Sequence, residues 1–349
     1  MAMVEKKPFR VALVGTDSLR AQEIKNALEE KKFPLTTIEF YDPAVEEEYS
    51  KLTEFASEPR VIHHLDLSLL EGLDLVFLAA DEATNRRCGQ MALEKKFRAI
   101  DLHQTFSADE KIPVIVAGVN DEVIIQQDAF LISNPHPATI ILAHLLHLLK
   151  PNFGLVKALA LVLQPASAFG ESGIEELANQ SVSLLSAASI KKKVFREQVA
   201  FNLLAPIEKA GPDGFTADEK LIMTEVRRVM QEPELPLSLC LVQVPVFHTY
   251  AIMTYLEFER PTNIREVESL FQAHSLFRLA DARKRLNVNS VSVAGKEEIF
   301  IGQIKQEESS PCGLWIWAIA DNLTLGSALN ALEIARFLFN RRDEVSPVS

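Results

Sequence analysis

The sequence predicts an α/β protein in which a doubly wound parallel sheet is followed by an α+β unit with a mixed or antiparallel sheet. Three observations support this prediction. Residues 1–134 alternate short apolar strands with helical segments, which is typical of a parallel sheet. From Leu155 onward, several long strands follow one another with few crossover helices. A glycine turn joins the first strand to the first helix, as in dinucleotide-binding units.

The elements of the first half follow from apolar runs that end at turn residues. The first strand, Phe9–Val14, ends at Gly15, and a helical pattern then runs through Leu28. A second helix is expected from Glu82 to Lys95. The other expected strands of this half are 36–41, 61–62, 73–80, 98–101, 114–117 and 129–133.

The second half begins with a polar stretch that contains two prolines, 133–139, which leads into the apolar run 140–150. Pro137 stands where a helix would begin, and proline suits the first helical position because its missing N–H would be unpaired there. The expected strands after this helix are 156–164, 237–247, 249–259, 298–305 and 314–320. The expected helices are 173–185, 217–230, 263–272 and 324–340.

The composition argues against several classes of partner. The 349 residues carry a formal net charge of -12, which argues against nucleic acid and anionic membranes because both attract basic surfaces. No apolar stretch is long enough to span a bilayer, and the first ten residues do not form a signal-peptide core. Three widely spaced cysteines predict neither disulfides nor a metal site, so a cytoplasmic location is expected.

Four short motifs occur in the chain in a characteristic order. They are Ser133-Asn134-Pro135-x-x-x-Thr139, Gln164-x-x-Ser167-x-x-Gly170-x-x-Gly173, Val244-Pro245-Val246 and Ala320-Asp321-Asn322-Leu323. Together they resemble the aspartate-semialdehyde dehydrogenases and their acyl-phosphate reductase relatives. The resemblance implies a Rossmann-type dinucleotide-binding domain from residues 1–134 plus 321–349. Residues 135–320 would form the dimerisation and substrate domain.

The family's reaction needs a cysteine and a histidine that this sequence lacks at the matching positions. In the family, a cysteine thiolate attacks the aldehyde, hydride passes to NADP, and phosphate cleaves the thioester, with a histidine as acid/base. The nucleophile's position is Pro137, which cannot form a covalent intermediate. The histidine's position is Tyr250, and His248, two residues earlier and expected on the same strand face, is the candidate stand-in. Gln164 is retained.

Other charged positions of the family have also changed. The phosphate-binding arginine falls at Ser107, and two lysines fall at Leu221 and Leu325. Glu225 and Arg227 match the family, but we expect them on a solvated helix face. None of the three cysteines begins a helix, so no replacement nucleophile is expected.

The resemblance implies NAD or NADP as cofactor, held by Gly15, Ser18, Asp42, Ala80, Gly170 and Asn322. Ser18 and Ala80 replace glycines that let the backbone approach the diphosphate. Nearby carboxylates weaken phosphate binding by repulsion. Asp42 at the end of the second strand favours a ribose 2′-hydroxyl, hence NAD over NADP.

Three hypotheses follow. The first is a homodimer without the covalent chemistry, kept for binding or regulation. The second is an active NAD(P)-dependent semialdehyde oxidoreductase of amino-acid biosynthesis that uses Tyr250 or His248 as acid/base. The third is a mixed dimer with an active dehydrogenase subunit. A site filled by Phe169, His136 and Tyr250 would indicate that the former active site has become core.

Overall fold

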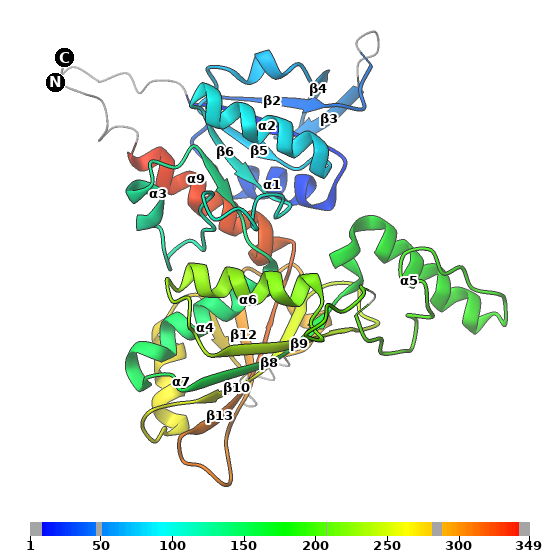
Figure 1. Ribbon diagram of the computed structural model, residues 1–349. Coiled ribbons are helices and arrows are strands. Elements are labelled where there is room, and N and C mark those ends of the chain that lie inside the picture. Colours follow the sequence, from blue (N-terminus) through cyan, green and yellow to red (C-terminus); the bar gives the residue numbers. More distant parts are fainter. Residues whose placement is uncertain (1–8, 47–50, 207, 281–287, 342–349) are drawn as a thin grey trace. The chain divides into compact units, whose positions relative to one another are not determined.

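The computed structural model describes residues 9–46, 51–206, 208–280 and 288–341 (Figure 1). The chain forms two compact units. Unit 1 comprises Met1–Pro135 and Ser327–Ser349, and unit 2 comprises His136–Gly326. The sequence prediction placed residues 321–326 in the first domain, whereas in the structure they belong to unit 2.

Unit 1 is built on a seven-stranded sheet with the order β3-β4-β2-β1-β5-β6-β7. All neighbours are parallel except β3, which is antiparallel to β4. The predicted doubly wound sheet is therefore confirmed. The strands are β1 (Arg10–Val14), β2 (Thr37–Asp42), β3 (Lys51–Phe55), β4 (Glu58–His64), β5 (Leu75–Leu78), β6 (Arg98–Asp101) and β7 (Leu131–Ser133). The prediction of a strand at 114–117 is wrong, because Val114 forms only an isolated bridge with Ser133.

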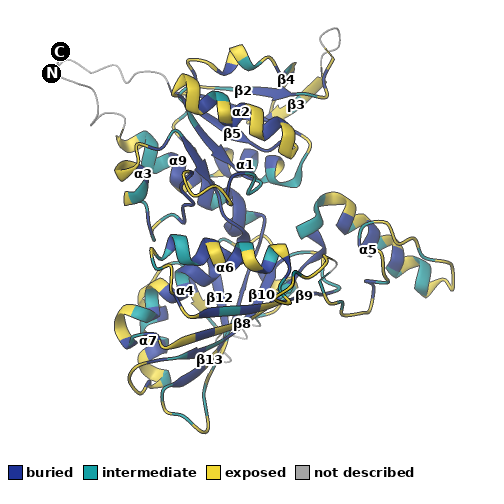
Figure 2. Cartoon of the chain, viewed as in Figure 1, coloured by how far each residue is buried: buried dark blue, intermediate teal, exposed yellow. Residues whose placement is uncertain are grey.

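Both faces of this sheet are covered by apolar cores, which explains why its central strands read as continuous apolar runs (Figure 2). Helices α1 (Leu19–Glu30) and α9 (Asn330–Arg341) pack on one face, and α2 (Glu82–Lys95) packs on the other. The short elements η1 (Leu67–Leu70) and α3 (Glu122–Gln126) complete the unit. The helix expected at 324–340 is divided into a π-helix, η3 (Thr324–Leu329), and α9.

Unit 2 is built on a six-stranded sheet with the order β11-β12-β13-β10-β8-β9. The pairs β8–β9 and β11–β12 are parallel and the others are antiparallel, so the predicted mixed sheet is confirmed. The strands are β8 (Lys157–Gln164), β9 (Leu237–Gln243), β10 (Tyr250–Glu257), β11 (Phe277–Leu279), β12 (Ile299–Gln306) and β13 (Gly313–Ala320).

The longer helices that pack on this second sheet cover one of its faces, and the short helix α8 (Ser290–Val293) packs on the other. Helices α4 (Pro137–Phe153), α6 (Ala217–Val229) and α7 (Ile264–Ala273) contribute to the large core on that face. On the opposite face, Leu159, Leu161 and Trp315 are 36–40% exposed. Helix α8 contributes Val293 to a small apolar cluster with β10, β12 and β13. Among the helices of the described ranges, none combines the length and apolar character needed to cross a membrane.

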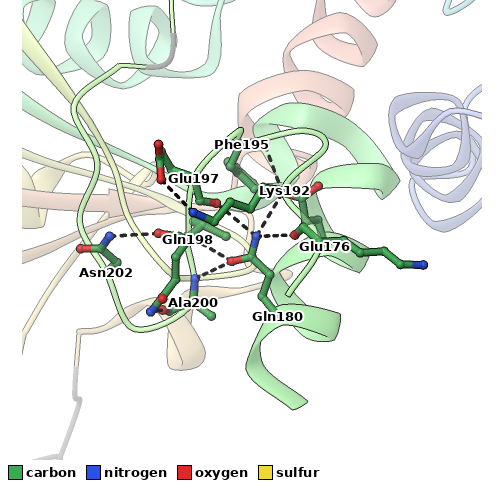
Figure 3. Close-up of polar contacts among 10 residues, drawn as sticks. Glu176, Gln180, Lys192, Phe195, Glu197, Gln198, Ala200 and Asn202 are labelled. Atoms are coloured by element: carbon green, nitrogen blue, oxygen red, sulfur yellow. Dashed lines mark hydrogen bonds and ion pairs between the residues drawn. The ribbon is translucent and has the colours of Figure 1, made fainter. Parts of the chain in front are cut away.

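An arm extends from the end of β8 and comprises η2 (Ala166–Phe169), α5 (Gly170–Leu185) and the returning chain to residue 204 (Figure 1). Figure 3 shows Glu176 and Gln180 of α5 pointing toward this returning chain. The Glu176 carboxylate accepts hydrogen bonds from the backbone N–H groups of Lys193, Val194 and Phe195. Polar side chains therefore tie the two sides of the arm together.

Candidate functional site

The candidate site in unit 2 begins at the N-terminus of α4. Pro137 is the first residue of this helix, as the sequence predicts. His136 is the N-cap, and its Nδ1 atom accepts a hydrogen bond from the Ala138 N–H at 3.1 Å. The histidine therefore takes the capping role that a serine or aspartate usually has.

A chain of hydrogen bonds connects this cap to the neighbouring strands. His136 Nε2 lies 3.2 Å from the Tyr250 hydroxyl, which donates to Gln164 Oε1 at 3.1 Å. Gln164 Nε2 donates to Gln243 Oε1 at 3.4 Å, and Gln243 Nε2 donates to the Val244 carbonyl at 3.1 Å. The chain thus connects α4, β10, β8 and β9, and it includes two of the residues that the sequence selected, Tyr250 and Gln164.

The direction of this chain is determined at both ends. The Ala138 N–H can only donate, so His136 Nδ1 carries no proton and the neutral ring holds it on Nε2. His136 then donates to Tyr250, and each following group donates to the next, until the last donor reaches a carbonyl that can only accept. His136, Tyr250 and Gln164 are 7%, 1% and 4% exposed, so this arrangement is a satisfied buried network.

A buried carboxylate occupies the N-terminus of α4. Glu225 of α6 is 0% exposed, and its Oε2 accepts from the His136 N–H at 2.9 Å and from the Thr139 hydroxyl at 2.6 Å. The His136 N–H and the positive end of the helix dipole both favour the ionised form of this carboxyl group. The expectation that Glu225 is solvated was wrong because α6 turns this face toward α4. Arg227 is also engaged, since its guanidinium donates to two backbone carbonyls.

Very little open space remains beside Gln164. The cavity lined by Gln164 measures about 20 Å³, which is room for about one water molecule. Gln164, Phe169, Thr216, Asp218, Leu241 and Gln243 are among its lining residues. His136 and Tyr250 are buried next to Gln164, so their side chains fill the space around the Gln164 amide.

His248 does not lie on the strand face that the sequence predicted. It occupies a bend between β9 and β10, and β10 begins only at Tyr250. Thr249 between them has a φ of +78°, which breaks the alternation of a strand. Its N–H donates to Asn322 Oδ1 at 3.0 Å, and this contact helps to hold the left-handed conformation.

In unit 1, Gly15, Ser18 and Ala80 meet where β1 and β5 end. Gly15 has a φ of +84°, and a Cβ at this position would lie 2.4 Å from the Ala80 nitrogen, so only glycine fits. Ser18 caps α1 by accepting from the Ala21 N–H, and its hydroxyl donates to the Ala79 carbonyl at 3.1 Å. The serine side chain therefore joins the helix to β5.

Asp42 is engaged within the same region. Its carboxylate accepts from the Thr16 N–H and hydroxyl, each at 3.0 Å, and from the Ala44 N–H at 2.9 Å. Asp17 on the turn forms an ion pair with Lys51 at 2.6 Å. As they stand, these side chains do not fit a dinucleotide: Ser18 occupies the glycine position, Asp17 adds a carboxylate, and Asp42 already has three donors. The selection of NAD by Asp42 stays a prediction.

The remaining predicted cofactor residues, Gly170 and Asn322, lie in unit 2. Gly170 has a φ of +69° and begins α5. Asn322 Oδ1 accepts from the Ser167 hydroxyl at 3.1 Å, in addition to its bond with Thr249. Both residues therefore shape the loop that follows β8.

None of the three cysteines begins a helix in the part of the chain that the structure describes. Burial raises the pKa of the Cys88 thiol to about 12, so it stays protonated at neutral pH. Cys240 lies within β9 and Cys312 in a turn. Ser107, at the expected phosphate-binding position, is buried beside the Ser133 hydroxyl at 2.8 Å. Within the described residues, no group of three or more acidic, histidine or cysteine side chains could hold a metal ion.

Together, the doubly wound sheet of unit 1 and the mixed sheet of unit 2 define the class of two-domain proteins with an NAD(P)-binding type of fold. The family model for the semialdehyde dehydrogenase NAD binding domain matches residues 10–127. The model for the semialdehyde dehydrogenase dimerisation domain matches residues 146–325. The chain belongs to the aspartate-semialdehyde dehydrogenase family.

Known members of this family are similar over nearly their full length. The aspartate-semialdehyde dehydrogenase of Rickettsia bellii is 28% identical over 335 residues, which cover 95% of this chain and 98% of that protein. The crystal structure of aspartate semialdehyde dehydrogenase II from Vibrio cholerae, complexed with ASA, is 25% identical with a TM-score of 0.88 and coverages of 96% and 99%. A probable aspartate-semialdehyde dehydrogenase from Pseudomonas aeruginosa is 26% identical, also with a TM-score of 0.88 and coverages of 96% and 100%.

Sequence reasoning did not identify three residues of the unit 2 network by their role. The capping role of His136, the burial of Glu225 and the contact of Gln243 with Gln164 all depend on tertiary packing. The only local signal for Glu225 was its match to a family glutamate, since the charged face of α6 was expected to be solvated.

Proposed function

We propose that this protein does not catalyse the covalent, phosphate-dependent dehydrogenation of a semialdehyde, and that it acts as a homodimeric binding or regulatory protein. The observation that carries this proposal is the start of α4, where Pro137 holds the position at which the family resemblance expects the nucleophile. A proline side chain has no group that can add to an aldehyde.

The surroundings of Pro137 give the proposal its second support. A thiolate at a helix N-terminus is stabilised by free N–H groups and by the helix dipole. Here the His136 N–H is bonded to Glu225 and the Ala138 N–H to the His136 ring. A thiolate or oxyanion placed here would also be repelled by the Glu225 carboxylate at close range in a region of low dielectric. Restoring the cysteine alone would therefore not restore its activation.

The proposed homodimer is supported by the exposed face of the unit 2 sheet and by the match to a dimerisation domain. Exposed apolar patches of this kind mark protein interfaces. The arm adds further exposed apolar side chains, which are Val182, Leu185, Phe201 and Leu203. A second copy of this chain is the proposed partner, and a mixed dimer with an active dehydrogenase is the competing arrangement.

The first experiment is a phosphate-dependent assay of NADP and NAD reduction with aspartate semialdehyde. The wild-type protein, Pro137→Cys and the double variant Pro137→Cys/Tyr250→His are compared with an active family member. We expect no turnover above the protein-free control for all three. Turnover by the wild type would refute the proposal and support an oxidoreductase that uses other residues.

A second experiment tests dinucleotide binding separately from chemistry. Thermal unfolding is followed with NAD, NADH, NADP and NADPH, since a ligand at about a hundredfold excess over its Kd stabilises by about 2.7 kcal/mol. We expect no shift with any of them. Light scattering after size-exclusion chromatography measures the oligomer, and a monomer at micromolar concentration would contradict the homodimer.

A further inference from the structure

The arm of unit 2 buries one phenylalanine ring and leaves another exposed. Phe195, on the returning chain, is 1% exposed and packs against Phe169 with the two ring centroids 5.2 Å apart. These two rings belong to the small apolar core of the arm. Phe201, further along the same segment, is 67% exposed, and Leu203 is 66% exposed. The arm therefore presents a large aromatic side chain that its own core does not use.

The backbone of Phe201 has a left-handed conformation, with a φ of +58°, which is unfavourable for a residue with a large side chain. Among the described non-glycine residues with a positive φ, it is the only aromatic one. It lies in a turn that the Asn202 N–H closes on the Val199 carbonyl at 3.2 Å, where glycine is usual. Glycine would fit this turn with less strain, so the shape of the turn does not explain the exposed ring.

A buried glutamine fixes this turn beside a basic segment. Gln180 Oε1 accepts from the Val199 and Ala200 N–H groups at 2.8 and 3.3 Å. Its Nε2 donates to the Lys191 and Glu197 carbonyls at 2.9 and 3.2 Å, so both segments meet at one side chain (Figure 3). The exposed basic side chains of this segment that form no ion pair with the described residues are Lys191, Lys193 and Arg196.

The rest of the chain is acidic. Residues 165–204 contain four acidic and four basic side chains, so the remaining residues carry the entire formal net charge of -12. A second copy of the chain therefore offers negative charge that complements the basic segment of the arm. The match to the dimerisation domain, residues 146–325, also includes the whole arm. Both observations favour a second copy as the partner.

We propose that the arm binds a second copy of this chain, with Phe201 as the anchor of the contact and the basic segment 191–196 placed against acidic side chains of the partner. A few aromatic and arginine side chains supply most of the binding energy of protein interfaces. The hydrogen bonds of Gln180 hold the backbone on both sides in place before binding, which lowers the entropy lost on association. The inference rests on the proposed homodimer and adds the residues that make the contact.

Sedimentation equilibrium measures the dimer Kd of the wild type, Phe201→Ala and the control Leu52→Ala. Leu52 on β3 of unit 1 is 61% exposed, so the control removes a similarly exposed apolar side chain. The Kd should rise at least about thirtyfold for Phe201→Ala, since an anchor contributes about 2 kcal/mol or more, and should stay unchanged for Leu52→Ala. An unchanged Kd in Phe201→Ala would overturn the anchor and leave the homodimer standing, whereas a monomeric wild type would overturn both.

The dependence of the Kd on salt concentration tests the basic segment. The wild-type Kd should rise with salt, because salt screens attraction between exposed charges. Lys191→Glu/Lys193→Glu should weaken the dimer and abolish this rise. The control Lys32→Glu/Lys111→Glu changes the net charge equally through two exposed lysines of unit 1 and should keep the wild-type salt dependence. The same salt response in both double variants would overturn the role of the basic segment.

Hydroxyl-radical labelling of Phe201 in the wild-type protein tests the contact without a substitution, so it decides the matter should Phe201→Ala fail to fold. Labelling is compared at protein concentrations well below and well above the dimer Kd. The ring is 67% exposed in the single chain, so its labelling should fall severalfold on dimerisation. Equal labelling at both concentrations would show that Phe201 lies outside the interface and would overturn the proposal.

Discussion

Replacement of Glu176 by glutamine tests whether one buried carboxylate holds the arm of unit 2 together. Its Oε2 atom accepts from the Lys193 and Val194 N–H groups at 2.8 and 2.7 Å, and its Oε1 atom accepts from the Phe195 N–H and from Gln180, each at 3.2 Å (Figure 3). A glutamine amide keeps only one acceptor oxygen, so two of these donors would face an NH₂ group. Since hydrogen bonds to charged groups contribute about 1.5–3 kcal/mol each, the local loss should be about 3 kcal/mol or more.

Hydrogen exchange is the appropriate assay because the loss is confined to one side of the arm. A loss of about 3 kcal/mol predicts exchange about 100-fold faster for the amides of residues 193–195. The matched control is Glu175→Gln, which changes a carboxylate one residue away on the same helix and should leave these amides unchanged. Wild-type exchange rates at residues 193–195 in Glu176→Gln would refute the role that we assign to this carboxylate.

The remaining predictions concern the two strand-end regions and are read out by chemical denaturation. Tyr250→Phe removes a hydroxyl from the buried network and should cost about 1–3 kcal/mol; an unchanged midpoint would show that the network contributes nothing. Gly15→Ala should cost more than about 3 kcal/mol because its Cβ would overlap Ala80, whereas Gly118→Ala, with a φ of +78° but open space, should lose only about 1–2 kcal/mol. Equal losses would contradict the steric explanation. Thr249→Gly should stabilise by about 1 kcal/mol by relieving the left-handed backbone, and a destabilised variant would contradict this.

Local sequence signals were sufficient to predict a helix boundary where the residues at that boundary determine it by their own capping or backbone preferences. The helix predicted at Glu82–Lys95 has those bounds because Asp81 caps its start and Lys96 ends it in a left-handed conformation. Pro137 marked the start of α4 for the same kind of reason. The doubly wound sheet was predictable because its central strands, buried on both faces, are apolar at consecutive positions.

Local sequence signals failed to predict the structure of a segment, or the burial of a residue, where contacts with other parts of the chain determine it. The apolar run 114–117 resembles a strand, but Asn120 binds the Val114 carbonyl and the Val116 N–H and turns the chain away from the sheet. Nothing in the sequence distinguishes Glu225 from a solvated glutamate, and only the packing of α6 against α4 shows that it is buried. His248 was placed on a strand because the left-handed conformation of Thr249 has no signal in a β-branched residue.

In unit 2, hydrogen bonds connect the residues around Pro137 to one another. His136 is held in the neutral tautomer with its proton on Nε2, because its Nδ1 atom accepts a hydrogen bond at the start of α4. The Tyr250 hydroxyl in turn donates a hydrogen bond to Gln164. The Glu225 carboxyl group occupies the N-terminus of α4, where the helix would otherwise stabilise negative charge on a reacting group. Each of these side chains satisfies another, so replacing His136, Tyr250 or Glu225 by a side chain that forms no hydrogen bond leaves a buried polar group unpaired, at a cost of about 1–3 kcal/mol.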